Sequence, residues 1–293
     1  MSVRDYAGVA RAPFLALPVT LVAVGAGAAA HAGRFDSTRA LWALIGLTAL
    51  HAAVNAFNEA SDFRTGIDFH TKRTPFSGGS GTLPAGRLGY RAALGVGILG
   101  SLVGLAVGAW FLTIVGWILV PVIVLGAVAV LAYTDILARA YVGEAFAGLG
   151  LGFLPVLGTW IVQAETVDRL AVVAAVPAFF MTFNLLLLNE FPDESADRAG
   201  GRRNLVLLLG RRAAARVYAL AALAVPAWLL AAVLFGELPS ACLAAMLPSI
   251  LLAAPFRWMA AGTSEAVPHP ALAANVMWIL ATNLALGAAL WLG

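Results

Sequence analysis

Two clusters of carboxylate, amide and imidazole side chains stand out because their spacing places each cluster on one face of a helix. The first cluster has spacings of four, three and four residues: His51, Asn55, Asn58 and Asp62. On a helix with 3.6 residues per turn these side chains form one polar stripe. Gly66 then interrupts the helical pattern, so the chain can bend and return Asp68 towards Asp62.

The second cluster lies far downstream, where Asn189, Asp193 and Asp197 recur every four residues. Both clusters end apolar segments, and they offer the oxygen ligands that magnesium prefers, which are one or two carboxylates together with substrate phosphates. We predict that two facing pairs each hold a magnesium ion against one diphosphate: Asp62 with Asp68, and Asp193 with Asp197. Asn58 is a further predicted metal ligand, and Asn58 and Asn189 are predicted contacts of the diphosphate.

Basic residues follow both carboxylate clusters, and such cations stabilise a departing diphosphate as its bond to carbon breaks. The predicted diphosphate contacts among them are Arg64, Lys72, Arg73, Arg198 and Arg202. The alternative is that they belong to the ordinary belt of cytoplasmic positive charge. Between the clusters, the segment 76–81 (FSGGSG) can present backbone N–H groups to an anion or form a flexible turn.

Each acidic residue also has a simpler interpretation, as a solvated charge at the membrane interface. Two sets that share one pattern on one side of the membrane favour a function instead, because buried ionisable groups are costly in a bilayer. His51 and Asn55 share the polar stripe and are predicted to line a cavity. For His51 a purely intrahelical role is the alternative.

The elements that position these residues are membrane helices. The 293 residues are 61% hydrophobic and 11% charged, with a mean hydropathy of +0.91, which indicates an all-α, polytopic membrane protein. A single cysteine excludes an internal disulfide, and scarce histidine and cysteine argue against a zinc or haem site. The net charge of +3, without basic and aromatic residues interleaved in a polar region, argues against a nucleic-acid partner.

About nine apolar segments have spanning length, in a single domain covering residues 1–293. They are 13–32, 39–58, 91–112, 114–133, 143–163, 169–189, 213–235, 239–255 and 271–292, with a division of the long run 91–133 at Thr113. The first segment imitates a signal peptide, but its length favours an uncleaved span. The two longest polar loops, about 59–90 and 190–212, carry the clusters and are predicted to cap a polar cavity.

The placement of basic residues predicts a cytoplasmic amino terminus in the cell (inner) membrane. With that orientation, only Arg34, Arg39 and Arg169 of the 18 basic residues fall on the opposite side. Both carboxylate clusters are then cytoplasmic, on the side where phosphorylated metabolites occur.

The segments NEASDFRTGID and NEFPDESADRAGGRRNL resemble the two signature motifs of the UbiA superfamily of intramembrane prenyltransferases. The greatest likeness is to the MenA-like branch, which attaches prenyl chains to 1,4-dihydroxy-2-naphthoate. Further similarities are ARAPFLALPV at the first span, the FSGGSG segment, Tyr133–Thr134, Gly143–Glu144 and GFLPVLGTWIVQ. The resemblance implies a helical bundle around a central cavity, with Mg²⁺ and a prenyl diphosphate beneath a cytoplasmic cap.

The resemblance also implies roles for individual residues. Asp62, Asp68, Asp193 and Asp197 match the catalytic, metal-binding carboxylates, and Tyr133 matches a tyrosine near the reacting carbon. Glu144 is assigned to the acceptor or cavity region. The segment from Asp135 to Arg139 departs from the family, because many members have a proline-containing segment there, beside the acceptor. Glu59 stands where many members have aspartate, which keeps an oxygen ligand available.

The resulting hypothesis is magnesium-dependent transfer of a prenyl group from a prenyl diphosphate to an aromatic acceptor of quinone-precursor or related natural-product type. Departure of diphosphate would leave an allylic cation that an electron-rich acceptor captures in a dry cavity. One alternative in the same fold is transfer to a non-aromatic lipid acceptor or cyclisation of the prenyl chain. A cation-coupled transporter is a further alternative, disfavoured because the charges gather on one side and not at the midplane.

Overall fold

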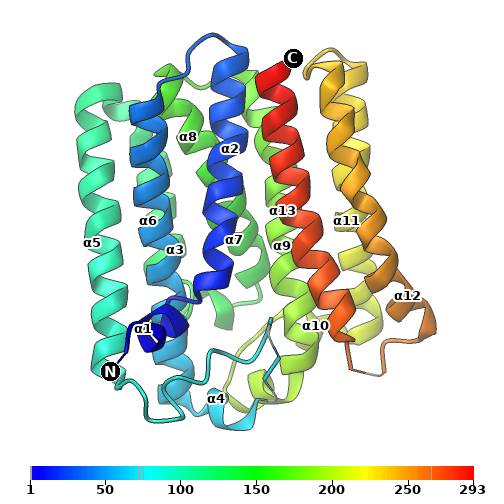
Figure 1. Cartoon of the computed structure of the whole chain (residues 1–293). Coiled ribbons are helices and arrows are strands. Elements are labelled where there is room, and N and C mark those ends of the chain that lie inside the picture. The colour runs from blue at the N-terminus through cyan, green and yellow to red at the C-terminus, as the bar shows by residue number, and fades with distance from the viewer. Residues whose placement is uncertain (1, 72, 75, 265) are drawn as a thin grey trace.

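The computed structural model describes residues 2–71, 73–74, 76–264 and 266–293, and the regular secondary structure in these ranges is helical. In chain order the elements are α1 (Val3–Val9), η1 (Ala12–Leu15), α2 (Ala16–His31), α3 (Ser37–Thr65), α4 (Ile67–His70), α5 (Tyr90–Val115), η2 (Gly116–Leu119), α6 (Val120–Leu131), η3 (Leu137–Arg139), α7 (Gly143–Gly148), η4 (Leu149–Phe153), α8 (Leu154–Ala164), α9 (Arg169–Ala199), α10 (Leu205–Leu209), α11 (Arg211–Leu234), η5 (Ser240–Leu252), α12 (Ala253–Ala261) and α13 (His269–Leu292). Figure 1 shows the long helices packed side by side as one bundle.

Eight helical stretches of the described chain are long and apolar enough to cross a membrane. One of them, Tyr90–Leu131, has 42 residues, and as a straight helix it would be about 63 Å long, twice the hydrocarbon thickness of a bilayer. Gly116, with φ of 69°, ends α5 and lets the chain fold back, so α5 and α6 run side by side (Figure 1). The predicted all-α bundle of about nine spans is confirmed, and the division predicted at Thr113 falls slightly before the observed one.

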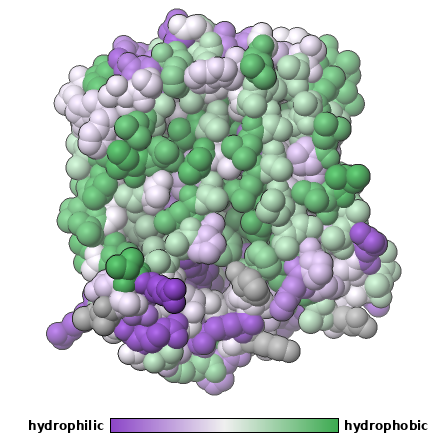
Figure 2. Space-filling model, in the orientation of Figure 1, coloured by the Kyte–Doolittle hydropathy of each residue, from purple (hydrophilic) through white to green (hydrophobic). Residues whose placement is uncertain are grey.

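The surface of the bundle separates an apolar belt from two polar ends. In Figure 2 hydrophobic residues form the broad middle of the molecule, and hydrophilic residues gather most densely at the lower end. That end contains α1, α4 and α10 (Figure 1). The chain is therefore an integral, multi-pass membrane protein with its most polar structure on one side.

Two helices extend beyond the spans predicted from hydropathy. The segments 39–58 and 169–189 were predicted to end where polar residues begin, but α3 continues to Thr65 and α9 to Ala199. The predicted cap loops 59–90 and 190–212 therefore begin as helix, and this part of the prediction is wrong. Hydropathy shows only where the apolar belt ends. The helix continues beyond that edge, because the polar residues that follow also form helical backbone hydrogen bonds. Gly66, at φ of 80°, ends α3 as predicted.

Two other predicted spans are helical but not regular α-helix. The segment 143–163 consists of α7, the π-helical turn η4 and α8, and the segment 239–255 begins as the 3₁₀ helix η5 and continues through α12. Glycines allow the π turn to lie against α9, since a Cβ on Gly152 would lie 2.3 Å from the carbonyl oxygen of Ala178. This close approach fixes α7 and its Glu144 beside α9.

Small residues also set the position of α2, which carries the amino-terminal segment. A Cβ on Gly27 would lie 2.4 Å from the carbonyl oxygen of Gly287 in α13, and a Cβ on Gly287 would lie 2.7 Å from that of Ala23. The two backbones therefore touch, as is typical where small residues meet between membrane helices.

Candidate active site

A cavity of about 150 Å³ lies at the polar end of the bundle, between the ends of α3 and α9 and beneath the connection 66–89, which we call the cap segment. Nine of the residues predicted from the sequence line this cavity: Asn55, Asn58, Asp62, Asp68, Tyr133, Asn189, Asp193, Asp197 and Arg202. Both polar clusters, separated by more than a hundred residues in the chain, therefore contribute to one cavity.

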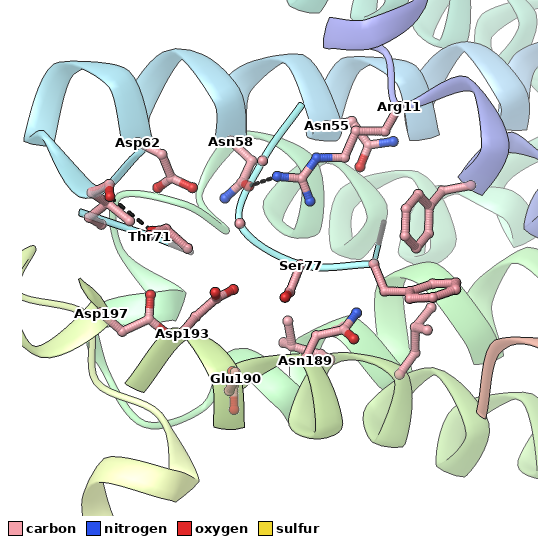
Figure 3. Close-up of a pocket in the computed structure, with 18 of the residues that line it drawn as sticks. Arg11, Asn55, Asn58, Asp62, Thr71, Ser77, Asn189, Glu190, Asp193 and Asp197 are labelled. Carbon is pink, nitrogen blue, oxygen red and sulfur yellow. Dashed lines mark hydrogen bonds between the residues drawn. The ribbon is translucent and has the colours of Figure 1, made fainter. Parts of the chain in front are cut away.

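The two carboxylate clusters face each other. Figure 3 shows Asn58 and Asp62 projecting from α3 towards Asp193 and Asp197, which project from α9. Ser77 of the cap segment lies between the two helices in the same view. The helical spacing seen in the sequence thus places each cluster on the cavity side of its helix.

The carboxylates retain oxygens that no donor reaches. Asp68 is 3% exposed, and its Oδ2 and the Oδ1 of Asp193 are buried without a hydrogen-bond partner. Burial, followed by the charges of Glu59 and Asp62, raises the pKa of Asp68 to about 7, although Arg11 and Arg73 oppose this. A site with unpaired buried carboxylate oxygens has the chemistry of a cation site.

The arrangement fits magnesium held jointly with a substrate. Within the described residues, no three histidine, cysteine or acidic side chains are close enough to hold a metal ion by themselves. The carboxylates are instead divided between two walls of the cavity (Figure 3). Magnesium commonly takes one or two carboxylates and completes its six oxygen ligands with phosphate and water, so this donor set suits a metal bound together with a diphosphate.

Arg202 joins the two clusters across the cavity. Its NH2 group donates a short hydrogen bond to Asp62, and its Nε lies 3.7 Å from Asp197 Oδ1. Asn204 donates to the other oxygen of Asp197 at 2.9 Å. Burial alone would lower the pKa of Arg202, but the Asp62 and Asp197 carboxylates raise it, so the guanidinium stays charged.

Arg11 is a second cation of the cavity that the sequence interpretation missed. Its Nε donates to Glu59 Oε1 at 2.9 Å and its NH2 to Asn58 Oδ1 at 3.2 Å. Ser80 of the cap segment donates to both oxygens of Glu59, from its backbone N and its Oγ, each at 2.7 Å. Both oxygens of Glu59 therefore already accept hydrogen bonds and Glu59 does not line the cavity, so its role as an available oxygen ligand stays a prediction. Arg11 precedes the first apolar span, where a lone arginine is indistinguishable from an ordinary flanking charge.

Two of the remaining predicted diphosphate contacts, Arg64 and Arg198, lie away from the cavity. Arg64 pairs with Asp135 at 3.2 Å and Arg198 with Glu194 at 3.3 Å, and both arginine side chains are more than half exposed. Neither lines the cavity. Arg73 reaches the backbone carbonyl of Asp68 at 3.4 Å, and Lys72 lies outside the described residues.

Of the residues predicted to contact the acceptor or line the cavity, only one lies at the cavity in the structure. Asn55 lines the cavity and donates to the carbonyl of Ala10 at 3.0 Å. His51 is buried with its Nδ1 3.0 Å from the carbonyl of Leu47 and does not line the cavity, which agrees with its intrahelical alternative. Glu144 is buried behind the cavity wall, where its Oε1 accepts from the backbone N of Leu205 at 2.6 Å. Glu190, which the sequence interpretation did not select, lines the cavity.

Several known proteins have sequences similar to that of this chain. A sequence profile described as the UbiA prenyltransferase family matches residues 16–280. Two curated proteins named 1,4-dihydroxy-2-naphthoate octaprenyltransferase are similar: that of Bacillus subtilis (strain 168) is 26% identical over 194 residues, which is 64% of this chain and 60% of that protein. That of Escherichia coli (strain K12) is 29% identical over 216 residues, which is 70% of this chain and 68% of that protein. The match thus spans about three fifths of the Bacillus protein.

A solved structure has the same fold. The structure of a UbiA homologue from Archaeoglobus fulgidus bound to DMAPP and Mg²⁺ matches with a TM-score of 0.68 and 17% sequence identity, covering 98% of this chain and 99% of that chain. The likeness therefore extends over nearly the whole chain and shows a shared fold.

Proposed function

This chain belongs to the UbiA prenyltransferase family, and we propose that it transfers a prenyl group from a prenyl diphosphate to an aromatic acceptor within the membrane. The observation that carries the proposal is the pair of carboxylate clusters facing each other across one buried cavity (Figure 3). Mg²⁺ is the proposed cofactor, held by Asp62, Asp68, Asp193 and Asp197 with Asn58 as a further ligand. When bound, it would neutralise the diphosphate as the bond to the prenyl carbon breaks.

The diphosphate itself is proposed to contact the cations and amides of the cavity. Arg11 and Arg202 are charged and line the cavity, so they can bind phosphate oxygens without leaving the protein interior. Asn189 lies on the same wall as Asp193 (Figure 3). Backbone N–H groups of the cap segment add to this set, since that of Gly78 faces Asp193.

The apolar part of the cavity can hold the prenyl carbon and the acceptor ring while they react. Val54, Leu151, Leu185 and Leu186 line the same space as the carboxylates, and Tyr133 contributes an aromatic ring. Such a lining excludes water, which would otherwise capture a prenyl cation in place of the acceptor. A tyrosine face also stabilises positive charge.

The aromatic nature of the acceptor is proposed from the names of the two curated relatives. The orientation is proposed from charge: hydrophilic residues gather at the end of the bundle that holds the cavity (Figure 2), and most of the basic residues precede the first span or follow the second, fourth, sixth and eighth predicted spans. By the positive-inside rule this end, with the amino terminus, is cytoplasmic in the cell (inner) membrane.

The test is release of diphosphate by purified protein with geranyl, farnesyl or longer prenyl diphosphates, with and without dihydroxynaphthoate or hydroxybenzoate, and with Mg²⁺ or EDTA. We expect release that requires both Mg²⁺ and an aromatic acceptor, and that falls by at least about a hundredfold in Asp62→Ala and Asp193→Ala. Asp168→Ala, at the opposite end of α9, is the matched control. Release without any acceptor would favour cyclisation or hydrolysis, and product analysis would identify it.

A further inference from the structure

The connection between α6 and α7, residues 132–142, brings one side chain to the cavity. Tyr133 is 8% exposed and lines the cavity. Among the residues of this connection, all of which the structure describes, no other lines it. Connections between helices are usually more mobile than the helices that they join. Tyr133 can therefore keep its place in the cavity only if other contacts anchor the connection.

Hydrogen bonds within the connection make its first half a compact turn. The backbone N–H groups of Ile136 and Leu137 donate to the carbonyl of Ala132 at 3.1 and 3.0 Å. The N–H of Ala138 donates to the carbonyl of Tyr133 itself, at 2.8 Å. The turn is thus bonded to itself at both of its ends, and a contact that holds any part of it also holds Tyr133.

Asp135 anchors this turn to the end of α3. Its Oδ1 accepts a hydrogen bond from Ser61 Oγ at 2.7 Å, and both of its oxygens accept from the NH2 group of Arg64 at 3.2 Å. Ser61 is 6% exposed and directly precedes Asp62 on α3. The anchor therefore ends beside one of the carboxylates assigned to the metal.

The other side of the connection is held by backbone atoms. The N–H of Arg203 donates to the carbonyl of Ala138 at 2.9 Å, and the N–H of Tyr141 donates to the carbonyl of Arg203 at 3.1 Å. Without the Asp135 side chain, the turn could move away from α3 while it stays attached beyond the end of α9. Asp135 is 53% exposed and does not line the cavity, so its effect on the site must pass through the turn.

Resting on the proposed function, we propose that Asp135 is a positioning residue that holds the ring of Tyr133 against the reacting prenyl carbon. A ring at this place excludes water and stabilises positive charge on the carbon. When the turn leaves α3, the metal and diphosphate contacts on α3 and α9 remain, but the ring no longer covers the carbon. Water then captures the prenyl cation, which gives a prenyl alcohol and a proton in place of the prenylated acceptor.

The experiment measures prenylated acceptor, prenyl alcohol and total diphosphate for wild type and Asp135→Ala, with geranyl diphosphate, Mg²⁺ and dihydroxynaphthoate or hydroxybenzoate. In Asp135→Ala we expect kcat for transfer to fall at least about tenfold, since a misplacement of about 1 Å can cost about a hundredfold. The share of diphosphate released without transfer should rise severalfold, because water reaches the carbon. The KM of geranyl diphosphate should stay within about twofold of wild type, which a general loss of structure would not allow.

Two further variants separate positioning from folding. Asp135→Asn keeps an oxygen that accepts from Ser61, so transfer should stay within about fivefold of wild type, the cost of an exposed ion pair. The double variant Ser61→Ala/Arg64→Gln removes both donors and keeps Asp135, and it should reproduce the product ratio of Asp135→Ala. It carries the test if Asp135→Ala does not fold.

A double-mutant cycle tests whether Asp135 acts through Tyr133. In a Tyr133→Leu background, Asp135→Ala should lower the remaining transfer by less than about threefold, because the ring that it positions is already gone. Glu165→Gln is the matched control for Asp135→Asn: Glu165 is 52% exposed, pairs with Arg39 at 2.8 Å at the opposite end of α3, and does not line the cavity. It should change neither kcat nor the product ratio.

Unchanged kcat and product ratio in folded Asp135→Ala, or in Ser61→Ala/Arg64→Gln, would overturn the positioning role. A loss of transfer in the Tyr133→Leu background as large as in the wild-type background would also overturn it. Absence of transfer to either aromatic acceptor by the wild type would instead count against the proposed function, and the role of Asp135 would fall with it.

Discussion

The contact between Arg202 and the two carboxylate clusters predicts how stability depends on magnesium. Arg202→Gln leaves Asp62 and Asp197 facing the cavity without the cation that now separates them. Removing one partner of a buried ion pair costs about 3–5 kcal/mol, and since the Arg202 side chain keeps 15% of its exposure, we expect about 3 kcal/mol, at the lower end. In a protein of this size that corresponds to a fall of about 6–12 °C in the midpoint of thermal unfolding.

Magnesium should reverse much of this loss. With Mg²⁺ and a prenyl diphosphate bound, the carboxylates regain a positive partner, so the difference between Arg202→Gln and wild type should fall to less than about half. The assay is thermal unfolding in detergent, with EDTA or with saturating Mg²⁺ and substrate analogue. A double-mutant cycle with Asp62→Asn should give a coupling of about 2 kcal/mol in the metal-free protein.

Arg203→Gln is the control, because the exposed guanidinium of Arg203 lies 5.8 Å from the ring of Tyr141 and not in the cavity. Its loss should cost no more than about 1 kcal/mol, with or without metal. The reasoning is refuted if Arg202→Gln unfolds within about 2 °C of wild type in EDTA, or if its deficit is the same with and without Mg²⁺.

Three other substitutions test separate features. Glu59→Gln weakens the ion pair with Arg11, and we expect a loss of about 3 kcal/mol, measured by thermal unfolding. Gly79→Ala places a methyl group 2.7 Å from Asp68 Oδ1, at a φ of 73°, so diphosphate release should fall about 10- to 100-fold while the protein remains folded. Gly27→Ala forces apart the touching backbones of α2 and α13, and size-exclusion chromatography should show much less monodisperse protein. Gly79→Ala is compared with Gly86→Ala, which has a similar φ of 68° but nothing within 4 Å of its Cβ; equal activity of the two would contradict the role of the contact with Asp68.

The sequence best predicted those cavity-lining residues whose position depends only on which face of a helix they occupy. The helical spacing in each cluster and the glycine at position 66 are local signals, and the structure places every member of the two clusters except His51 at the cavity, as the spacing requires. That the two clusters meet is not local information, because it depends on how helices far apart in the chain pack. The shared pattern of the two clusters and their predicted placement on one side of the membrane suggested that they meet, and the resemblance to a known family supported it.

Closeness in the sequence to a carboxylate cluster did not predict which basic residues line the cavity. Arg64 is two positions after Asp62 on the same helix, so it projects about 200° away from it, and it pairs with Asp135 outside the cavity. Arg202 follows the end of α9, where the chain can turn back, and it reaches both clusters. Glu190 could have been found by the same helical argument, since it lies seven residues before Asp197 and therefore on nearly the same face.

The bonds made by Glu59 have a consequence for the timing of turnover. One buried carboxylate holds both the cap segment, through Ser80, and the amino-terminal segment, through Arg11. Neither segment can move away without releasing a group that Glu59 needs as a partner in a water-poor environment, so the two are expected to open together in one cooperative step. We expect that step to limit how fast diphosphate leaves, so alterations to residues 2–11 should change the rate of product release although these residues precede the first membrane-spanning helix.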